Sequence, residues 1–549
     1  MSEQSISTAP ATGNSPVHAT SADTTRWSRA NFAEAIQGVQ TPLSWTYWDY
    51  TMERSVRVAF GRMGVFARRD LRTPTNVDEK FAAPFFGLPA GNVQLMWLIG
   101  EAMPGTTGDA VVEQMFGERR PEGAAKAKSS GKKRYPIVAV KLPLCTRWAY
   151  KTLRPILADQ RKWWRQAVIT SPPTDLATAT ALLQKSAEEY VRVGSRHASM
   201  SLIGQGLAEQ IEGLAEAAWG NRERAADLMT GYGSMEETEL MGDLWEVAQD
   251  KLPLGEFLAR HGYHGPDEGN LASTIWREDP APVKRMAEQY RVAKVAHPKE
   301  KEAAQLARRE AAEKDLLASL PRSKRSKAKL ILKLGKALIP MREVGKAGFL
   351  HAIDAGRCAA RAIGDDLVRR GLIDERDDVF YLTYDELLAG VSTPQQAVVI
   401  DRKADHARYK TLDVPQAWTG NPTAPVAVAK APEAPTAGVE QLTGIGVFGD
   451  EEVSGRARVA LDPASVDLEA GDILVCKTTD PSWTPLFLVA EALVIDTGGQ
   501  MSHGAIVARE LGVPCVINTL TGTRDIPDGA HITVNGTTGV VTIKQVEPA

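Results

Sequence analysis

One histidine of this chain lies in a context suited to carrying a phosphoryl group. His503 follows the glycine pair Gly498-Gly499, and it opens a helix-compatible segment that Gly512 can end. Backbone N–H groups at the start of a helix are unpaired and lie at the positive end of its dipole, so they favour an anion. A histidine that accepts and then passes on a phosphoryl group divides a difficult transfer into two easier ones. The spacing therefore predicts a phosphorylatable imidazole, whereas an isolated histidine would be a structural residue.

The same segment resembles the phosphohistidine motif of the mobile, or swivelling, domain of phosphoenolpyruvate-utilising enzymes. That motif reads G-G-x-x-[ST]-H-x-A-x-x-A-R-x-x-G-x-P, and the matching residues here are Gly498, Gly499, Ser502, His503, Ala505, Ala508, Arg509, Gly512 and Pro514. The resemblance implies that His503 is phosphorylated and that Gly498, Gly499, Ser502 and Arg509 support it. A surface ion pair is the alternative for Arg509, and a domain that has lost its activity is the alternative for the whole motif.

A second group of candidate residues lies in the segment His261–Pro280, which reads HGYHGPDEGNLASTIWREDP. Removing the proton of an acceptor hydroxyl requires a base, and histidine is suitable near neutral pH. The segment offers two candidate bases, two carboxylates to orient them and one arginine to neutralise phosphoryl oxygens: His261, His264, Asp267, Glu268 and Arg277. The alternative is a polar turn in which Arg277 pairs with Glu278 or Asp279.

The elements that must position these residues fall into two regions. In the first, apolar residues recur at helical spacing with charged residues opposite, as in Asp175–Arg192, Leu202–Ala218 and Ala303–Leu320. In the second, short β-type runs alternate with glycine and aspartate turns, and Asn535-Gly536 predicts a hairpin. The sequence thus predicts a multidomain chain, with a largely α-helical N-terminal region and a C-terminal α/β (β/β/α) swivelling phosphohistidine domain.

Composition marks the expected boundaries. Residues 1–25 are rich in Ser, Thr, Ala and Pro without the apolar run of a signal peptide, so we expect a disordered lead-in. Residues 26–412 are the predicted helical, acceptor-binding region. Pro, Ala, Thr and Gly dominate residues 413–439, which indicates an interdomain linker spanning roughly 25–30 Å as a flexible coil. Residues 440–549 are the predicted phosphohistidine domain.

The overall composition limits the classes of partner. The chain has 549 residues and a net charge of −3, from 65 basic and 68 acidic residues, which does not indicate nucleic acid or a membrane as a partner. Its apolar stretches are too short for a membrane span, so we expect a cytoplasmic protein. The four cysteines are scattered without a CxxC pair, and no cluster of metal ligands is evident, so no metal site is assigned.

The helical region resembles rifamycin-phosphotransferase-like and related dikinase-like proteins. The matching segments are Trp27, Arg29, Asn31 and Glu34, Thr41–Trp45, Phe85–Asn92, Met103–Gly105, Asp377–Leu387 and His261–Pro280. In the last of these the related proteins usually read GHRGPxExDLASPRWREDP. This chain has Tyr263-His264 in place of His-Arg, and Gly269-Asn270 where the last acidic residue is expected. Residue roles in that segment therefore cannot be copied from the relatives.

The resemblance implies one piece of a dikinase-like enzyme. Enzymes that load this type of histidine from ATP place an ATP-grasp domain before the helical region, and about 25 residues precede Trp27 here. Enzymes that exchange phosphate with phosphoenolpyruvate carry a β/α barrel after the histidine domain, and 46 residues follow His503. The expectation is a two-subunit enzyme in which a partner ATP-grasp subunit holds ATP and Mg²⁺ and charges His503.

This split arrangement is similar to the phenylphosphate synthase type, including the enzymes that phosphorylate 4-cresol. The predicted protein is therefore a subunit of an aryl phosphate synthase that transfers a phosphoryl group from His503 to a phenolic acceptor such as 4-cresol or phenol. ATP would be split to AMP, orthophosphate and the aryl phosphate. Two alternatives remain: a rifamycin-type antibiotic phosphotransferase, and a phosphohistidine relay or regulatory protein without a small-molecule acceptor.

Overall fold

The chain folds as two compact units in the computed structural model. The described residues are 15–30, 32, 36–103, 106–116, 134–222, 224–232, 236–424, 439–449, 452–463, 466–499 and 502–544. The first unit comprises Met1–Met200, Gly269–Ser273 and Gly345–Ala429, and the second comprises Ser201–Glu268, Thr274–Val344 and Lys430–Ala549. The sequence predicts domain boundaries at residues 412 and 440. These boundaries stay a prediction, because the two compact units are defined by their internal contacts.

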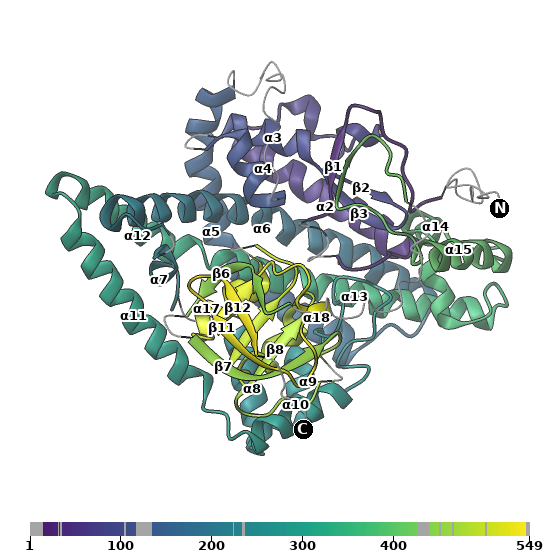
Figure 1. The fold of residues 1–549 in the computed structure, drawn as a ribbon. Helices are drawn as coiled ribbons and strands as arrows, with labels where there is room; N and C mark the ends of the chain where they lie inside the picture. The colour runs from purple at the N-terminus through teal and green to yellow at the C-terminus, as the bar shows by residue number, and fades with distance from the viewer. Residues whose placement is uncertain are drawn as a thin grey trace, which may run out of the picture. The chain divides into compact units, whose positions relative to one another are not determined.

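Helices form most of the first unit (Figure 1). They include α2 (Pro42–Met63), α3 (Val93–Ala102), α4 (Gly108–Phe116), α5 (Tyr135–Trp164), α14 (Tyr384–Ala389) and α15 (Gln396–Tyr409), with the first part of α6 (Leu176–Trp219) and most of α13 (Met341–Arg369). α2 begins where the Thr41 side chain accepts a hydrogen bond from the Ser44 N–H, with Pro42 in the first helical position. Among the described residues, no helix is both long enough and apolar enough to span a bilayer.

One helix is longer than its sequence pattern indicates. The predicted helices Asp175–Arg192 and Leu202–Ala218 are parts of the single helix α6, which has 44 residues. The residues between them include glycine and serine, which weaken a helix without ending it, and no proline interrupts the hydrogen-bond ladder. The third predicted helix, Ala303–Leu320, is confirmed as α11 (Pro298–Ser319).

A small antiparallel sheet completes the first unit. Its strand order is β2-β3-β1-β4, formed by Ala82–Phe85, Leu88–Asn92, Arg26–Ser28 and Ala417–Thr419. β4 belongs to the segment that composition assigns to a linker, yet Trp418 faces Trp27 in the register with β1 and is buried against Phe85. This buried indole makes that part of the predicted linker a strand. Residues 425–438 of the same segment lie outside the described residues.

Part of the expected disordered lead-in is also packed. The Ser21 hydroxyl donates to Asp78 Oδ1 at 2.7 Å and accepts from Trp27 Nε1 at 2.8 Å, and Val17 is buried. Composition could not reveal these contacts because the partners lie elsewhere in the chain. Residues 1–14 lie outside the described residues.

An eight-stranded sheet is the centre of the C-terminal part of the second unit. Its order is β5-β12-β11-β7-β8-β9-β10-β6, formed respectively by Gln441–Thr443, Val540–Lys544, His531–Asn535, Glu452–Ala460, Asp472–Cys476, Ala492–Ile495, Cys515–Ile517 and Ile445–Phe448. The strands β7, β8, β9 and β10 run parallel, and the outer strands pair antiparallel. The predicted fold class, a helical N-terminal region followed by a C-terminal α/β domain, is confirmed.

The second unit also contains several helices (Figure 1). They include α7 (Ala225–Leu228), α8 (Glu236–Ala248), α9 (Leu254–His261), α10 (Ala281–Val292), α11, α12 (Arg322–Leu338), α16 (Thr484–Phe487), α17 (His503–Leu511) and α18 (Gly522–Asp525). α11 and α12 pack on each other through a buried group that contains Leu316 and Ile331.

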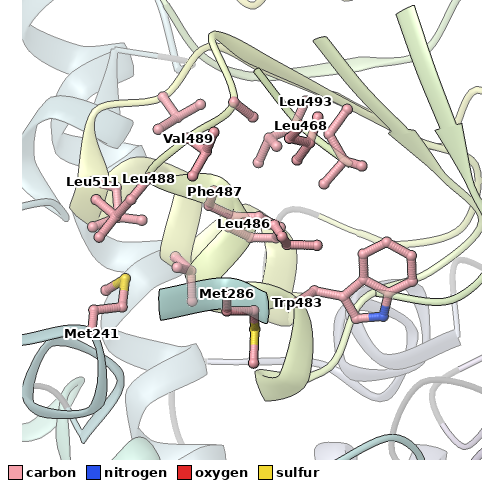
Figure 2. Close-up of a cluster of buried hydrophobic side chains, with 14 of the residues drawn as sticks. Met241, Met286, Leu468, Trp483, Leu486, Phe487, Leu488, Val489, Leu493 and Leu511 are labelled. Atoms are coloured by element: carbon pink, nitrogen blue, oxygen red, sulfur yellow. The ribbon is translucent and has the colours of Figure 1, made fainter. Parts of the chain in front are cut away.

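The two faces of the central strands supply two hydrophobic clusters. In β8, Ile473 and Val475 join one cluster, whereas Leu474 and Cys476 join the other, as the two-residue period of a strand requires. The second cluster also contains side chains from α8 and α10, and Figure 2 shows Met241 and Met286 among the residues of this cluster. The sheet and helices α8 and α10 therefore share one core.

Candidate active site

His503 is the first residue of α17. Ser502 precedes it in an extended conformation, and the Ser502 hydroxyl accepts a hydrogen bond from the Ala505 N–H at 3.5 Å. The Ser502 N–H donates to the Gly499 carbonyl at 2.8 Å, which closes the turn before the helix. At the other end Gly512 adopts a left-handed φ of 67° and stops the helix, as the spacing predicts.

The imidazole of His503 is buried beside hydroxyl groups. His503 is 6 % exposed, and its Nε2 atom lies 3.3 Å from Thr484 Oγ1. Thr484 is completely buried at the start of α16. A Cβ atom at Gly504 would lie 2.7 Å from Thr479 Oγ1, so only glycine allows the beginning of α17 to approach that threonine. A neutral hydroxyl thus lies beside the His503 imidazole at the positive end of a helix.

The site lies where parallel strands end. Thr479 and Thr484 follow β8, His503 follows β9, and ligand sites of α/β sheets lie outside the carboxyl ends of such strands. Asp496, the residue after β9, is buried and accepts hydrogen bonds from Thr519 Oγ1 at 2.8 Å and from the Thr523 N–H at 3.0 Å. This carboxylate holds the loop after β10 against the end of β9.

Asp480 links this edge to the second candidate cluster. Its Oδ1 accepts hydrogen bonds from the backbone N–H of Ser482, at 2.8 Å, and from the Ser482 hydroxyl. Its Oδ2 accepts from the backbone N–H of Asp267 at 3.4 Å. Asp267 has a left-handed φ of 48°, which aspartate tolerates better than most residues. The second unit therefore brings a loop of the predicted phosphohistidine domain into contact with the predicted acceptor segment.

The acceptor segment forms a closed loop, which we call loop 262–277. The Arg277 N–H donates to the Gly262 carbonyl at 3.0 Å and the Trp276 N–H donates to the His264 carbonyl at 2.9 Å, which closes its neck. Gly265 lies so close to Ile275 that an added Cβ atom would be 2.8 Å from the Ile275 Cα. The neck thus fixes the backbone on both sides of His264.

Within this loop His264 and Glu268 form a buried pair. His264 Nδ1 and Glu268 Oε2 are 2.7 Å apart, and each side chain is less than a tenth exposed. The His264 imidazole lies against the Tyr263 phenol ring with ring centres 4.1 Å apart, and the centre of the Trp276 ring is 5.8 Å from that of the imidazole. Because a carboxylate only accepts, Nδ1 carries the hydrogen, and Nε2 is then the basic nitrogen of the neutral ring.

The other candidate base, His261, belongs to a different cluster. Its Nε2 lies 2.8 Å from Asp243 Oδ2, and Arg260 also donates to that oxygen at 3.1 Å. Burial by itself would raise the pKa of Asp243, but the hydrogen bonds and charges of His261 and Arg260 outweigh burial and lower that pKa. Arg277 pairs with Glu278 at 3.1 Å, which is the alternative left open by the sequence.

Arg509, the predicted support of the phosphohistidine, is directed elsewhere on α17. Residues six apart on a helix project about 120° from each other. Arg509 Nε donates to the Ala505 carbonyl at 3.2 Å, and the side chain lines a cavity of about 40 Å³ together with Tyr232 and Glu510. Burial lowers the pKa of Arg509. Its role at the phosphohistidine stays a prediction.

The C-terminal half of α17 is anchored by buried polar groups. Burial raises the pKa of Glu510 to about 7, and backbone hydrogen bonds from Gly231 and Tyr232 partly oppose that rise. The Thr230 hydroxyl donates to the Arg509 carbonyl at 2.7 Å. This end of the helix thus holds the helix in place, whereas the His503 end faces the loops after the strands.

Several residues of the site were not predicted from the sequence. Thr479, Asp480, Thr484 and Asp496 have no recognisable spacing relative to His503. One signal was available: Asp496 and the Thr479-Asp480 pair each come within four residues of the end of a β-type run. Polar residues in that position gather at one edge of a parallel sheet. In the described part of the chain, no group of three or more His, Cys, Asp or Glu residues is placed to hold a metal ion.

Two family models match parts of the chain. Residues 468–539 match the mobile domain of PEP-utilising enzymes, and residues 251–343 match the fourth domain of rifampicin phosphotransferase. The first segment contains His503 and the loops after β8, β9 and β10. The second contains loop 262–277. The two candidate clusters therefore lie in two separately matched segments.

Curated relatives agree with these matches. The chain is 39% identical over 210 residues to a rifampicin phosphotransferase of Streptomyces sviceus, covering 38% of this chain and 24% of that protein. It is 32% identical over 297 residues to a rifampicin phosphotransferase of Bacillus subtilis, covering 52% of this chain and 34% of that protein. An uncharacterized protein of Mycobacterium tuberculosis is 32% identical over 289 residues, covering 52% and 30%. The matched part thus amounts to between 24% and 34% of each of these relatives' length.

Proposed function

We propose that this protein is a phosphotransferase component in which His503 carries a phosphoryl group to the hydroxyl of a small-molecule acceptor. The observation that carries the proposal is the position of His503: the first residue of α17, beyond the carboxyl ends of parallel strands, in a segment that matches the mobile domain of PEP-utilising enzymes. The positive end of the helix dipole at the start of α17 would favour the transferred anion.

The transfer has two balanced steps. In the first, an imidazole nitrogen of His503 forms a bond to phosphorus while the phosphorus–oxygen bond to the donor breaks. In the second, the acceptor oxygen bonds to phosphorus, the phosphorus–nitrogen bond breaks, and the acceptor proton passes to the base. His264 is our candidate base, because Glu268 orients its ring and would stabilise the imidazolium that forms.

The acceptor is proposed to be of the rifamycin type. The relatives are named rifampicin phosphotransferases, and the segment that holds loop 262–277 matches a domain of that enzyme. A phenolic acceptor such as 4-cresol or phenol, and with it an aryl phosphate synthase, rests only on the resemblance drawn from the sequence. We retain the phenol as the second candidate.

The donor is proposed to be ATP with Mg²⁺, bound by an ATP-grasp protein or domain that charges His503. This assignment rests on the resemblance to dikinase-like enzymes. The residues of this chain have three tasks in the proposal: to present the imidazole, to position the acceptor hydroxyl and to take its proton.

Intact-mass analysis of the full chain tests the proposal. The chain is incubated either with Mg·ATP and a purified ATP-grasp protein or with potassium phosphoramidate, which phosphorylates imidazoles directly, and His503→Ala is the control. We expect an acid-labile phosphoryl adduct on the wild type alone, which rifampicin discharges with formation of a phosphorylated product.

The other outcomes separate the alternatives. Discharge by 4-cresol and not by rifampicin would favour the aryl phosphate synthase. An adduct that persists with both acceptors would favour a relay protein. No adduct with either donor, or an equal adduct on the His503→Ala variant, would overturn the proposal.

A further inference from the structure

A short turn of the second compact unit lies between two helices and contacts both of them. This turn, which we call turn 230–232, follows α7 in the chain, and its neighbours are α11 and the C-terminal half of α17. The turn and both helices belong to the second unit, so all of their contacts lie within one compact part of the chain.

Helix α11 fixes the turn from one side. Arg309 Nη1 donates to the Thr230 carbonyl at 3.2 Å and also to the Gly231 carbonyl. Arg309 is 1 % exposed, and its Nε lies 3.5 Å from Glu313 of the same helix. Gly231 has a left-handed φ of 62°, and a Cβ atom there would lie 2.5 Å from the Leu306 backbone nitrogen. Only glycine therefore lets the turn lie this close to α11.

The hydrogen-bond donors of the turn are directed to α17. The Thr230 hydroxyl donates to the Arg509 carbonyl at 2.7 Å. The backbone N–H groups of Gly231 and Tyr232 donate to the Glu510 carboxylate. Thr230 is completely buried, so its hydrogen bond is not in competition with water. The carbonyls of the turn thus bind α11 while its donors bind α17, and the turn fixes one helix relative to the other.

Gln305 of α11 makes a direct contact with the end of α17. A Cβ atom added at Gly512 would overlap the Gln305 amide group, so glycine at this position leaves room for α11. The Gln305 Oε1 also lies 3.3 Å from the Thr230 hydroxyl oxygen. Gly512 therefore has a second role besides ending α17, because it lets the two helices approach each other.

The opposite end of α17 faces the predicted acceptor segment. The loop after β8 supplies the hydroxyl beside His503, and Asp480 of the same loop accepts a hydrogen bond from the Asp267 N–H at 3.4 Å. Asp267 belongs to loop 262–277, which contains the candidate base His264. Because α17 is a helix of 9 residues, about 14 Å long, a shift of its C-terminal half also moves the end that carries His503.

We propose that Thr230 and Arg309 are positioning residues for phosphoryl transfer from His503 to the acceptor. They act through α17: Arg309 holds the turn, Thr230 holds the C-terminal half of the helix, and the helix places His503 before loop 262–277. A reacting group displaced by about 1 Å can lose on the order of 10²-fold in rate, so the position of this helix has a large effect. This inference rests on the proposed function, since it concerns the discharge of a phosphorylated His503.

Thr230→Val is the central variant, because it keeps the shape of the side chain and removes the hydroxyl. Thr230→Ser restores the hydroxyl and is the rescue variant. Thr51→Val is the matched control: Thr51 is also completely buried, but its hydroxyl donates to the Tyr47 carbonyl of its own helix at 2.8 Å. Arg309→Met removes both hydrogen bonds from α11 to the turn and keeps a long side chain.

The measurement is single-turnover discharge of the phosphoramidate-charged full chain to rifampicin. We expect Thr230→Val to charge like the wild type, because phosphoramidate needs only the imidazole, but to discharge about tenfold more slowly. The rifampicin concentration that gives the half-maximal rate should change little. Arg309→Met should discharge more slowly still, whereas Thr230→Ser and Thr51→Val should discharge within about threefold of the wild type. Hydrogen exchange in α17 should be faster in Thr230→Val and unchanged in Thr51→Val.

The possible failures are distinct. A wild-type chain that is not charged, or that keeps its phosphoryl group with rifampicin, would overturn the proposed function and this inference together. Wild-type discharge with an unchanged rate in Thr230→Val would overturn the inference alone. Equal slowing in Thr230→Val and Thr51→Val, or a loss of charging as large as the loss of discharge, would also overturn it, because either result would show a general loss of stability.

Discussion

His503 and His264 are both buried in the second compact unit, but their neighbours differ. His503 lies at the start of a helix, and its Nε2 is within hydrogen-bond distance of the Thr484 hydroxyl. His264 lies in a loop and shares a short hydrogen bond with the Glu268 carboxylate. A carboxylate favours the positively charged imidazolium, whereas a hydroxyl and the positive end of a helix favour the neutral ring and a bound anion. The two environments therefore suit a base and a nucleophile respectively.

The largest expected effect comes from His503→Asn, which removes the nucleophile and keeps a polar side chain of similar reach. We expect no acid-labile adduct, because no other group in the site is positioned to form one in our proposal. The measurement is intact mass after treatment with phosphoramidate. An adduct of wild-type size on this variant would place the phosphorylation elsewhere.

His264→Asn should affect the discharge of His503 to the acceptor and leave its charging unchanged. Discharge to rifampicin should slow by about 10²–10⁴-fold, the usual contribution of a general base. Rapid-quench measurement of both steps tests this. Glu268→Gln is the companion variant. It keeps the shape of the side chain but removes the negative charge that stabilises the His264 imidazolium, so we expect a smaller loss of discharge rate than for His264→Asn. A variant that loses charging as strongly as discharge would contradict the separation of roles.

Thr484→Val should have a moderate effect on the first step. It keeps the shape of the threonine and removes the hydroxyl beside His503 Nε2, which is worth roughly 1–3 kcal/mol when the partner is buried. We expect charging to slow by about tenfold, measured with a fixed concentration of phosphoramidate. Thr484→Ser restores the hydroxyl and should recover most of the rate. Equal rates in the valine and wild-type chains would show that the hydroxyl has no part in presenting the ring.

The smallest expected effect on activity belongs to Glu510→Gln, at the other end of α17. Burial raises the pKa of Glu510 to about 7, above its ordinary value in the unfolded chain. The folded state then binds more protons than the unfolded state between about pH 4.5 and 7, so stability falls as pH rises through that window. Over the full window the loss is about 3 kcal/mol.

Denaturant unfolding at pH 5 and pH 8 measures this effect. The fall in stability between the two pH values should be smaller by about 2–3 kcal/mol in Glu510→Gln than in the wild type, while charging of His503 stays unchanged. An identical pH dependence in both chains would mean that the carboxylate is not protonated in the folded protein. Loss of charging in this variant would contradict the assignment of the His503 end of α17 to phosphoryl transfer and of the Glu510 end to anchoring the helix.

Sequence reasoning succeeded where the determining interactions are local. The hairpin of β11 and β12 around Asn535-Gly536 and the helix α17 with its Gly512 cap were both predicted, since turn residues and caps act over a few residues. It failed for α6, because a glycine and serine stretch weakens a long helix without ending it. It also failed for the strand Ala417–Thr419 and for the packed residues 15–25, whose partners lie far along the chain.

The candidate site divides in the same way. The sequence alone determined that His503 opens a helix after two glycines, and that the segment His261–Pro280 contains two histidines and several carboxylates that could do acid–base chemistry. Only the tertiary structure decided that His264 pairs with Glu268 while His261 pairs with Asp243, and that Thr484 is the neighbour of His503. It also decided that Ser44 of α2 and Arg357 of α13 donate hydrogen bonds to Asn270. The physical reason is range: caps and turns depend on residues within one turn of each other, whereas a buried side chain selects its partner from whichever segments the fold brings within hydrogen-bond distance.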